Sequence, residues 1–231
     1  MIDGKKVLAV ITARGNSKRL PHKNILDVGG RPLIAWSIEA AKNSLFIDRF
    51  ILSSDDDKII QTARKWGCEA PFKRPPELAC DETLIEHVLI HALDSIKEAY
   101  DYIVLLQPTS PLRTPKDIDE CIALCNEHGA SACVSVFQTK KSPYWTFRVD
   151  ESGCMTPFLR AEEPSHPRQN LLNTHMVNGA VYVAEVPWYI KNQTFFSANT
   201  VAYIMPPERS VDIDTKLDLM LVESIMNAGK A

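Results

Sequence analysis

Four cations gather directly after the first apolar run of the sequence, in a loop from Ala13 to Asn24 that contains no acidic residue. These cations are Arg14, Lys18, Arg19 and Lys23. Gly15 lets the backbone bend close to a ligand, because glycine has no Cβ, and Ser17 adds a neutral hydrogen-bonding group. Backbone amides and clustered cations after a buried strand suit a triphosphate. The spacing matches neither the Walker A nor the GxGxxG pattern, and a plain solvated loop is the alternative interpretation.

Two carboxylates near the end of the chain, Asp212 and Asp214, form a second candidate group. They are two positions apart in a segment that reads as extended, so both side chains point the same way. Such a pair suits Mg²⁺, which prefers oxygen ligands and bridges to substrate phosphates. Alternatively, Asp214 caps the helix that opens at Thr215, and both interpretations can hold together.

A third group follows a strand in the segment Leu105–Arg113, where two prolines fix a turn. Gln107, Thr109 and Ser110 present hydrogen-bonding groups there, which predicts contact with a polyhydroxylated ligand. The alternative is a rigid strand-to-helix turn with no ligand.

The elements that must position these residues alternate between strand and helix. Apolar runs predict strands at Val7–Thr12, Phe50–Ser53, Tyr102–Leu106, Ala132–Phe137, Ala180–Val183 and Val201–Met205. Amphipathic segments predict helices at Pro32–Lys42, Asp55–Trp66, Thr83–Ala99, Pro115–Glu127 and Thr215–Asn227. The alternation predicts an α/β, Rossmann-like fold with a mostly parallel sheet and helices on both faces. Ligands should bind at the carboxyl ends of its strands.

The alternation breaks between about residues 138 and 178, a stretch rich in aromatic side chains. Asp150–Gly153 is a turn signal between short β-like pieces. We expect an excursion, half hairpin and half loop, that covers a substrate or reaches a partner subunit. We therefore predict one domain over residues 1–231 with an inserted arm at about 138–178.

Bulk composition excludes several classes of protein. The chain has 231 residues and a formal net charge of −3, enough for one α/β core and without a general attraction to nucleic acid or anionic membrane. No run of about 18 apolar residues predicts a membrane span, and the first residues read as a strand rather than a signal peptide. Six cysteines without a CxxC pair are typical of reduced thiols in a cytoplasmic protein.

Three segments together resemble the acylneuraminate cytidylyltransferase family, which includes the CMP-sialic acid, CMP-legionaminate and CMP-pseudaminate synthetases. They are VLAVITARGNSKRLPHKN, IVLLQPTSPLR and RSVDIDTKLDL, and RPPELACDET and VNGAVYVA are similar as well. The similarity runs nearly end to end. The SPYW at Ser142–Trp145 resembles the legionaminate branch. The related family that acts on the eight-carbon sugar KDO lacks the LLQPTSPLR form.

The resemblance implies a fold of the nucleotide-diphospho-sugar transferase type, with CTP, Mg²⁺ and an acidic nine-carbon sugar as ligands. It also implies a homodimer in which the arm of one subunit reaches toward the other's site. The site residues that it implies are Ala13, Arg14, Ser17, Lys18, Lys23, Asn24 and Arg74 for the nucleotide, Gln107, Thr109, Arg168 and Asn178 for the sugar, and Asp212 and Asp214 for the metal.

Two segments depart from the family pattern. Residues 80–85, Cys-Asp-Glu-Thr-Leu-Ile, stand where relatives often carry a serine-rich stretch, so the pattern does not carry over nucleotide contacts to this loop. Met176 stands where many relatives carry an arginine, which would pair bidentately with a carboxylate. Either Arg168 alone binds the sugar's carboxylate or the accepted sugar differs. His175 is either a weaker substitute cation or a plain polar loop residue.

The resemblance implies attack by the sugar's anomeric hydroxyl on the α-phosphorus of CTP, with pyrophosphate leaving. In that scheme Arg14, Lys18 and Mg²⁺ take the charge of the pyrophosphate, and Lys23 stabilises the α-phosphoryl group. The hydroxyl proton goes to Asp212 or to a metal-bound hydroxide. The alternatives are a CMP-KDO-type synthetase, a metal-dependent glycosyltransferase that shares the α/β core and a DxD, and a nucleotide-binding homologue without activity.

Overall fold

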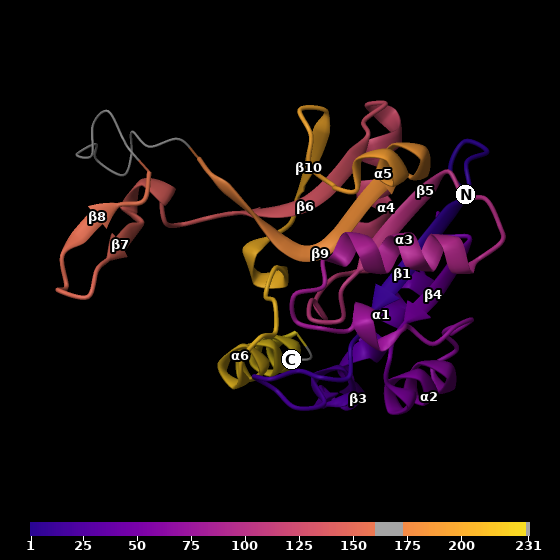
Figure 1. Ribbon diagram of the computed structural model, residues 1–231, viewed down its shortest axis with the longest axis horizontal. Helices are drawn as coiled ribbons and strands as arrows, with labels where there is room; N and C mark the ends of the chain where they lie inside the picture. The colour runs from indigo at the N-terminus through magenta and orange to yellow at the C-terminus, as the bar shows by residue number, and fades with distance from the viewer. Residues whose placement is uncertain (160–172, 230–231) are drawn as a thin grey trace.

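The computed structural model describes residues 1–159 and 173–229. Its centre is a six-stranded sheet in the order β10-β6-β9-β5-β1-β4. The strands are β1 (Val7–Thr12), β4 (Arg49–Ser53), β5 (Tyr102–Leu106), β6 (Ala132–Gln138), β9 (His175–Glu185) and β10 (Thr200–Ile204). Five strands run in one direction, and β9 runs against both of its neighbours. Figure 1 shows the sheet with helices on both sides.

Strand β9 contains the predicted strand Ala180–Val183, but it begins earlier, at His175, and runs antiparallel to its neighbours. The chain leaves β6 for the arm and returns alongside it, so that Gln138 lies opposite His175. An antiparallel neighbour can be reached by such a direct return, whereas a parallel neighbour needs a crossover connection, usually through a helix. The prediction of a mostly parallel sheet is therefore confirmed, with one strand reversed.

Alternating side chains of the buried strands supply two hydrophobic layers. In β1, Val7, Ala9 and Ile11 face one core, and Leu8 and Val10 face the other. Helices α1 (Leu33–Lys42), α2 (Asp57–Lys65) and α4 (Pro115–Glu127) pack on the first face, and α3 (Ile85–Ser95) and α5 (Val186–Asn192) on the second. Because β1 and β5 are covered on both faces, their sequences are apolar almost throughout, which is why they could be predicted.

The last helix, α6 (Lys216–Ala228), packs on a small hairpin of β2 (Asp27–Val28) and β3 (Arg31–Pro32). Its N-cap is Thr215, whose hydroxyl accepts a hydrogen bond from the Asp218 amide, while the Asp218 carboxylate accepts one from the Thr215 amide. The alternative in which Asp214 caps this helix is therefore wrong. Thr215 already satisfies the first turn, and the Asp214 carboxylate is directed elsewhere.

Four of the five predicted helices begin one or two residues later than expected, α3 ends at Ser95 rather than at Ala99, and one helix was missed. The helix expected from Thr83 begins only at Ile85, because the Thr83 hydroxyl donates to the Glu77 carbonyl at 3.2 Å instead of capping the helix. The helix expected from Asp55 begins at Asp57, with Asp56 as its N-cap. Short α5 directly follows β9 and carried no separate signal. No helix within the described ranges is long and apolar enough to cross a bilayer.

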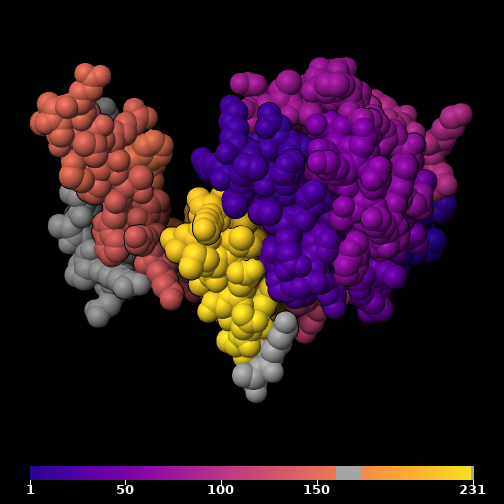
Figure 2. All heavy atoms as spheres, turned by 90° about the horizontal axis from the view of Figure 1, so that it is seen from below, coloured from indigo at the N-terminus to yellow at the C-terminus, as the bar shows by residue number. Residues whose placement is uncertain are grey.

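The arm leaves the sheet between β6 and β9 and carries its own hairpin, β7 (Phe147–Val149) and β8 (Met155–Pro157). The Asp150 carboxylate accepts hydrogen bonds from the Ser152 and Cys154 amides, which closes the predicted turn. Figure 2 shows the arm standing apart from the body, with α6 on the facing side. The expected hairpin is confirmed, and the rest of the expected arm, residues 160–172, lies outside the described residues.

A buried ionic cluster joins α4 to the segment after β10. The Asp117 carboxylate is buried and accepts hydrogen bonds from Tyr203 (3.0 Å) and Arg209 (2.6 Å), and from the amide and hydroxyl of Thr114. Nearby Arg113 is also buried, and desolvation lowers the pKa of its guanidinium to about 10. The Asp117 carboxylate therefore balances the charges of Arg113 and Arg209 and also takes part in the N-terminal cap of α4.

We expect Asp117→Ala to lower the free energy of unfolding by roughly 3 kcal/mol, because it removes the acceptor shared by Tyr203 and Arg209 and the counter-charge of buried Arg113. Urea unfolding followed by circular dichroism measures this. Glu120→Ala on the same helix is the matched control, since Glu120 makes only an exposed contact of 3.7 Å with Lys116, and should change stability by less than about 1 kcal/mol. Equal losses in the two variants would contradict the role of the cluster.

Candidate active site

A cleft of about 370 Å³ opens at the carboxyl ends of β1 and β5. Its lining combines the loop after β1, the segment between α2 and α3, the turn after β5 and the stretch before α6. The polar and charged residues that line it are Thr12, Arg14, Lys23, Asn24, Arg74, Asp81, Thr83, Gln107, Thr109, Asp212 and Asp214, together with Cys80. The three candidate groups of the sequence thus meet at the edge where α/β sheets bind ligands.

A larger hollow of about 550 Å³ lies at the base of the arm, between β6 and the end of β10. Among the described residues that line it, Lys140 is the one charged side chain. The smaller cleft contains several cations and several carboxylates. Because charge and hydrogen-bonding groups determine what a site can do chemically, the smaller cleft is the candidate active site.

The basic loop is fixed by a hydrogen bond to its own backbone and by two more to the stretch before α6. The Asn24 side chain is buried and donates to the Arg14 carbonyl at 3.0 Å. Lys23 Nζ donates to the Ile213 carbonyl at 2.8 Å and to the Asp214 carboxylate at 3.0 Å. These contacts orient the Lys23 ammonium into the cleft, where its side chain is only 13% exposed.

Gly15 is required by its packing against a neighbouring segment. A Cβ at this position would lie 2.8 Å from the side chain of Asp56, a distance that real contacts do not allow. The Gly15 amide donates to the Asp55 carboxylate at 3.1 Å. The loop therefore packs closely against the start of α2 at Gly15, and the expected approach of this backbone to a ligand stays a prediction.

Arg74 forms the floor of the cleft at this end. It is 4% exposed, lies 3.4 Å from the Asp55 carboxylate and leaves its Nε without a partner among the described residues. Burial lowers the pKa of its guanidinium, and Asp55 opposes that shift. A buried guanidinium with an unused donor is prepared to bind a polar group of a ligand.

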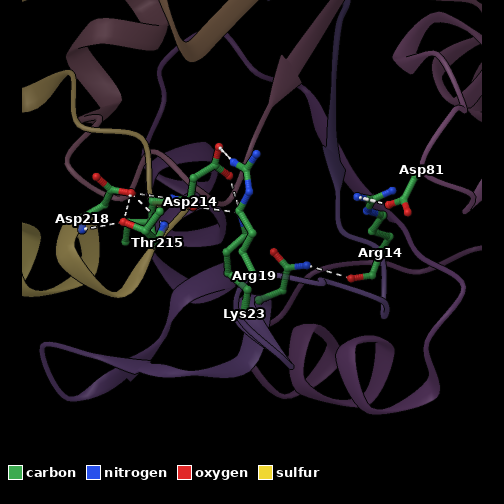
Figure 3. A network of polar contacts seen from close by, with 9 residues as sticks. Arg14, Arg19, Lys23, Asp81, Asp214, Thr215 and Asp218 are labelled. Atoms are coloured by element: carbon green, nitrogen blue, oxygen red, sulfur yellow. Dashed lines mark hydrogen bonds and ion pairs between the residues drawn. The ribbon is translucent and has the colours of Figure 1, made fainter. Parts of the chain in front are cut away.

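The acidic pair lies opposite the basic loop. Asp214 accepts hydrogen bonds from Lys23 at 3.0 Å and from Arg19 at 3.2 Å, as Figure 3 shows. Asp212 makes no ion pair in the described part of the chain. Partial desolvation raises the pKa of Asp212, with Asp214 adding to the rise and Thr109 and Lys23 opposing it. Both carboxylates line the cleft, so the oxygen donors expected for Mg²⁺ are on one side.

The turn after β5 meets β9 at a glycine. Gly179 has a φ of +74°, and a Cβ there would lie 2.9 Å from Oε1 of Gln107 and 3.9 Å from Oδ1 of Asp212. A side chain is excluded by both the backbone conformation and the space. Gly179 therefore lets Gln107 and Asp212 approach the same point.

The sequence matches the cytidylyltransferase family over residues 8–206. It is 34% identical over 230 residues to a CMP-N,N'-diacetyllegionaminic acid synthase of Legionella pneumophila, covering 97% of this chain and 98% of the relative. The chain belongs to the cytidylyltransferase family. It is a nucleotidyltransferase, and the family resemblance expected from its motifs is confirmed.

Further comparisons agree with this assignment. A pseudaminic acid cytidylyltransferase of Campylobacter jejuni is 32% identical over 217 residues, covering 93% of each chain. An N-acylneuraminate cytidylyltransferase of Escherichia coli is 33% identical over 220 residues, but this chain spans 52% of that longer protein. A CMP-2-keto-3-deoxy-manno-octonic acid synthetase solved with CTP superposes with a TM-score of 0.71 at 18% identity, covering 97% of this chain and 99% of that one. That likeness confirms the α/β fold.

Not every residue expected at the site lines this cytidylyltransferase cleft. Lys18 reaches its edge by an ion pair of 2.5 Å with Asp81. Ala13 is buried and continues β1, its amide donating to the Ser53 carbonyl at 3.1 Å. Ser17 lies in the loop but is not among the lining residues. Arg168 lies outside the described residues.

Asn178 is buried beneath the cleft rather than in its wall. Its Oδ1 accepts from Ser135 at 2.6 Å and from the Ala180 amide, and its Nδ2 donates to Ser210 at 3.0 Å and contacts the Met205 sulfur. All the polar atoms of the side chain are engaged within the protein. Direct sugar contact by Asn178 stays a prediction, and the contacts observed fix the backbone on either side of Gly179.

Two acids at the site were missed by the sequence analysis. The Asp55 carboxylate accepts a hydrogen bond from the Gly15 amide and forms an ion pair with Arg74. The Asp81 carboxylate forms ion pairs with Arg14 and Lys18. Asp55 follows the carboxyl end of β4, and the rule that ligands bind at such ends could have identified it. Asp81 lies in the loop that departs from the family's serine-rich pattern, and no local signal links it to the basic loop.

If Asn178 acts by fixing β9, Asn178→Ala should lower the free energy of unfolding by about 2 kcal/mol, because Ser135 and Ser210 each lose one hydrogen bond and the Ala180 amide loses its acceptor. It should also raise KM for both substrates, since Gly179 and the stretch before Asp212 would shift together. Thermal unfolding and steady-state kinetics measure these effects. Ser197→Ala, at an exposed turn after α5, is the control. A rise in KM for the sugar alone, at unchanged stability, would instead indicate a direct sugar contact.

Proposed function

We propose that this enzyme transfers CMP from CTP to the anomeric hydroxyl of a nine-carbon 2-keto acid sugar of the sialic or legionaminic type, releasing pyrophosphate. The observation that carries the proposal is the convergence, in one cleft, of the cations Arg14 and Lys23 with the carboxylates Asp212 and Asp214. The names of the relatives support both substrates. Family membership favours nucleotidyl transfer over the glycosyltransferase alternative.

The basic loop binds the triphosphate in this proposal. Arg14, Ser17 and Lys18 hold the outer phosphates, and backbone amides from Ala13 onward complete the cradle. Asn24 keeps the Arg14 backbone in place and borders the ribose. Arg74, with its free Nε, receives the cytosine end, where a buried donor selects a base with a matching acceptor.

Asp212 and Asp214 would hold Mg²⁺ together with phosphate oxygens, which fits a hard cation that keeps few protein ligands. The donor set agrees with this assignment because both carboxylates line the cleft and Asp212 makes no ion pair in the described part of the chain. When bound, the cation supplies charge neutralisation to the triphosphate. Arg19 and Lys23 hold Asp214 in position for it.

The transfer step needs alignment and charge stabilisation more than covalent catalysis. The anomeric oxygen bonds to the α-phosphorus as the bond to the β-phosphate oxygen breaks, and pyrophosphate leaves with the electron pair. Lys23 stabilises the negative charge on the α-phosphoryl oxygens, and its fixed hydrogen bond to the Ile213 carbonyl pre-orients it. The proton of the attacking hydroxyl goes to Asp212, one of the two candidate bases, whose carboxylate lines the cleft.

The sugar lies on the side of Gln107 and Thr109, which line the cleft beside Asp212. Their amide and hydroxyl groups suit sugar hydroxyls, and Arg168 is proposed for the carboxylate. Met176 is 54% exposed on the part of β9 that leads to the arm, outside the cleft lining. The nearly full-length match to the legionaminic acid synthase favours a legionaminic-type sugar.

Pyrophosphate release tests the proposal. With CTP and Mg²⁺, we expect turnover with one sugar from a panel of N-acetylneuraminic, legionaminic, pseudaminic and KDO acids. Asp212→Asn should lower kcat by at least about 100-fold, because the loss removes a preorganised charge at the reacting phosphate, and EDTA should abolish turnover of the wild type.

The matched control is Asp94→Asn, which removes an exposed carboxylate near the far end of α3 and should leave kcat unchanged. Turnover with KDO alone would identify the eight-carbon alternative. A folded wild type that binds CTP but turns over no sugar in the panel would refute the proposed reaction.

We propose that the enzyme works in the cytoplasm as a homodimer, with the arm as the contact between subunits. The arm exposes large apolar side chains, which are Trp145, Phe147, Val149, Met155 and Phe158. Apolar clusters of this kind on a protruding element mark protein interfaces. The described part of the arm has no core of its own to bury them.

Sedimentation velocity should give twice the chain mass of 25.9 kDa for the wild type. Phe147→Asp should shift it to the monomer, because a charge in the interface would be buried without a partner. Leu45→Asp introduces the same charge at a residue that is 80% exposed on the body of the molecule, and this control should stay dimeric. A monomeric wild type at micromolar concentration would overturn the assignment of the arm.

A further inference from the structure

Asp81 occupies the place where the phosphates of the nucleotide are expected. Its two carboxylate oxygens are divided between the two outer cations of the basic loop: Oδ1 lies 2.8 Å from Arg14 Nη2, and Oδ2 lies 2.5 Å from Lys18 Nζ. Figure 3 shows the Asp81 carboxylate turned toward the Arg14 guanidinium. Two oxygens on one centre, each facing a cation, reproduce the way a phosphate group engages such residues.

The backbone around Asp81 reinforces this contact. The Cys80 carbonyl accepts a second hydrogen bond from Arg14, at 3.1 Å. The hydrogen bond from Lys18 is the largest of the effects that hold the pKa of Asp81 below its usual range, and the same bond raises the pKa of Lys18. The carboxylate is therefore charged throughout the neutral pH range and competes with any other anion for these two cations.

The loop that carries Asp81 has few other anchors. It lies between the short helix at Pro76–Leu78 and α3, and α3 starts at Ile85 without a side-chain cap. The hydrogen bonds of residues 79–84 to the rest of the protein are local, except for those to Arg14 and Lys18. All three side chains of the contact are at least a third exposed, with values of 38%, 74% and 35% for Arg14, Lys18 and Asp81. Exposed ion pairs are weak enough to be exchanged.

We propose that Asp81 is an internal competitor for the outer phosphates: it neutralises Arg14 and Lys18 in the empty enzyme, yields them to CTP, and takes them back as pyrophosphate leaves. The inference rests on the proposed function, because it assigns the outer phosphates to these cations. It makes Asp81 a specificity-determining residue. A ligand must bring enough negative charge to displace a carboxylate from two cations at once, which a triphosphate does and a monophosphate at the α position does not.

Asp81→Asn keeps the size of the side chain and removes the charge. We expect its dissociation constants for CTP and for inorganic pyrophosphate to be about three- to tenfold lower than those of the wild type, the effect of removing two exposed competing ion pairs. The dissociation constant for CMP should change less than about twofold, since CMP lacks the outer phosphates. Isothermal titration calorimetry without sugar measures all three ligands, and Ki for pyrophosphate in turnover should fall in parallel.

Glu82→Gln is the matched control, because it removes one negative charge from the adjacent position of the same exposed loop. Glu82 forms no ion pair within the described residues and acts on Lys18 only at longer range, so its variant should tighten the binding of CTP and pyrophosphate less than Asp81→Asn does. Thermal unfolding checks that both variants are folded. If both variants bound CTP and pyrophosphate more tightly by the same factor, the change in net charge would explain the effect and the proposal would be overturned. Weaker binding by Asp81→Asn would overturn it as well, since it would show that Asp81 supports the ligand site.

These outcomes are separable from failure of the proposed function. If the wild type binds neither CTP nor pyrophosphate, the function itself fails. If it binds both and turns over a sugar, while Asp81→Asn binds them with unchanged affinity, only the role of Asp81 is wrong. A pyrophosphate affinity that rises in Asp81→Asn while the CMP affinity is constant supports competition at the outer phosphates specifically.

Discussion

Positive charge concentrated at the carboxyl edge of the sheet is the constraint on which the rest of the site depends. A triphosphate needs several cations in one place, yet such cations repel one another until a ligand neutralises them. The basic loop has no acid of its own, so counter-charges come from distant segments: Asp81 before α3 pairs with Arg14, and Asp214 before α6 pairs with Lys23. Each ion pair also fixes a segment that lines the cleft. The same contacts therefore balance the charge of the basic loop and determine the shape of the cleft.

The opposite wall of the cleft is held by buried hydrogen bonds. Arg113 donates to the carbonyls of Gln107 at 3.2 Å and Ala180 at 2.6 Å, and Asn178 ties β9 to the stretch before Asp212 through Ser210. Unsatisfied buried donors are costly, so this wall keeps one arrangement. Exposed ion pairs on the basic side exchange easily with ligand charge. In the proposed function, the cleft therefore combines a rigid wall that faces the sugar with a wall that faces the phosphates and can exchange its ion-pair partners.

The reversed strand β9 connects the site to the arm. Because β9 runs antiparallel to its neighbours, its carboxyl end lies beside the amino ends of β5 and β6, away from the cleft. Gly179, in the middle of the strand, lies at the cleft beside Gln107. At its amino end the same strand is paired with the end of β6, where Met176 lies opposite Phe137 and is exposed. Strand β9 therefore runs from the base of the arm to the cleft, and the apolar hairpin of this arm is the surface that we propose for contact with the partner subunit.

The sequence by itself determined the layered α/β core, because strands buried on both faces must be apolar throughout and helices between them must be amphipathic. It also identified the basic loop, the turn after β5 and the acidic pair, whose residue types are unusual enough to indicate chemistry. Only the tertiary structure decided the direction of β9, the cap at Thr215, the partner of Gly15 and the burial of Asn178. It alone revealed Asp81 as the partner of Arg14. Apart from the cap, in which Thr215 and Asp218 are three positions apart, these features depend on residues far apart in the chain. Arg19 and Asp214, for example, are 195 positions apart, and local periodicity carries no information about such pairings.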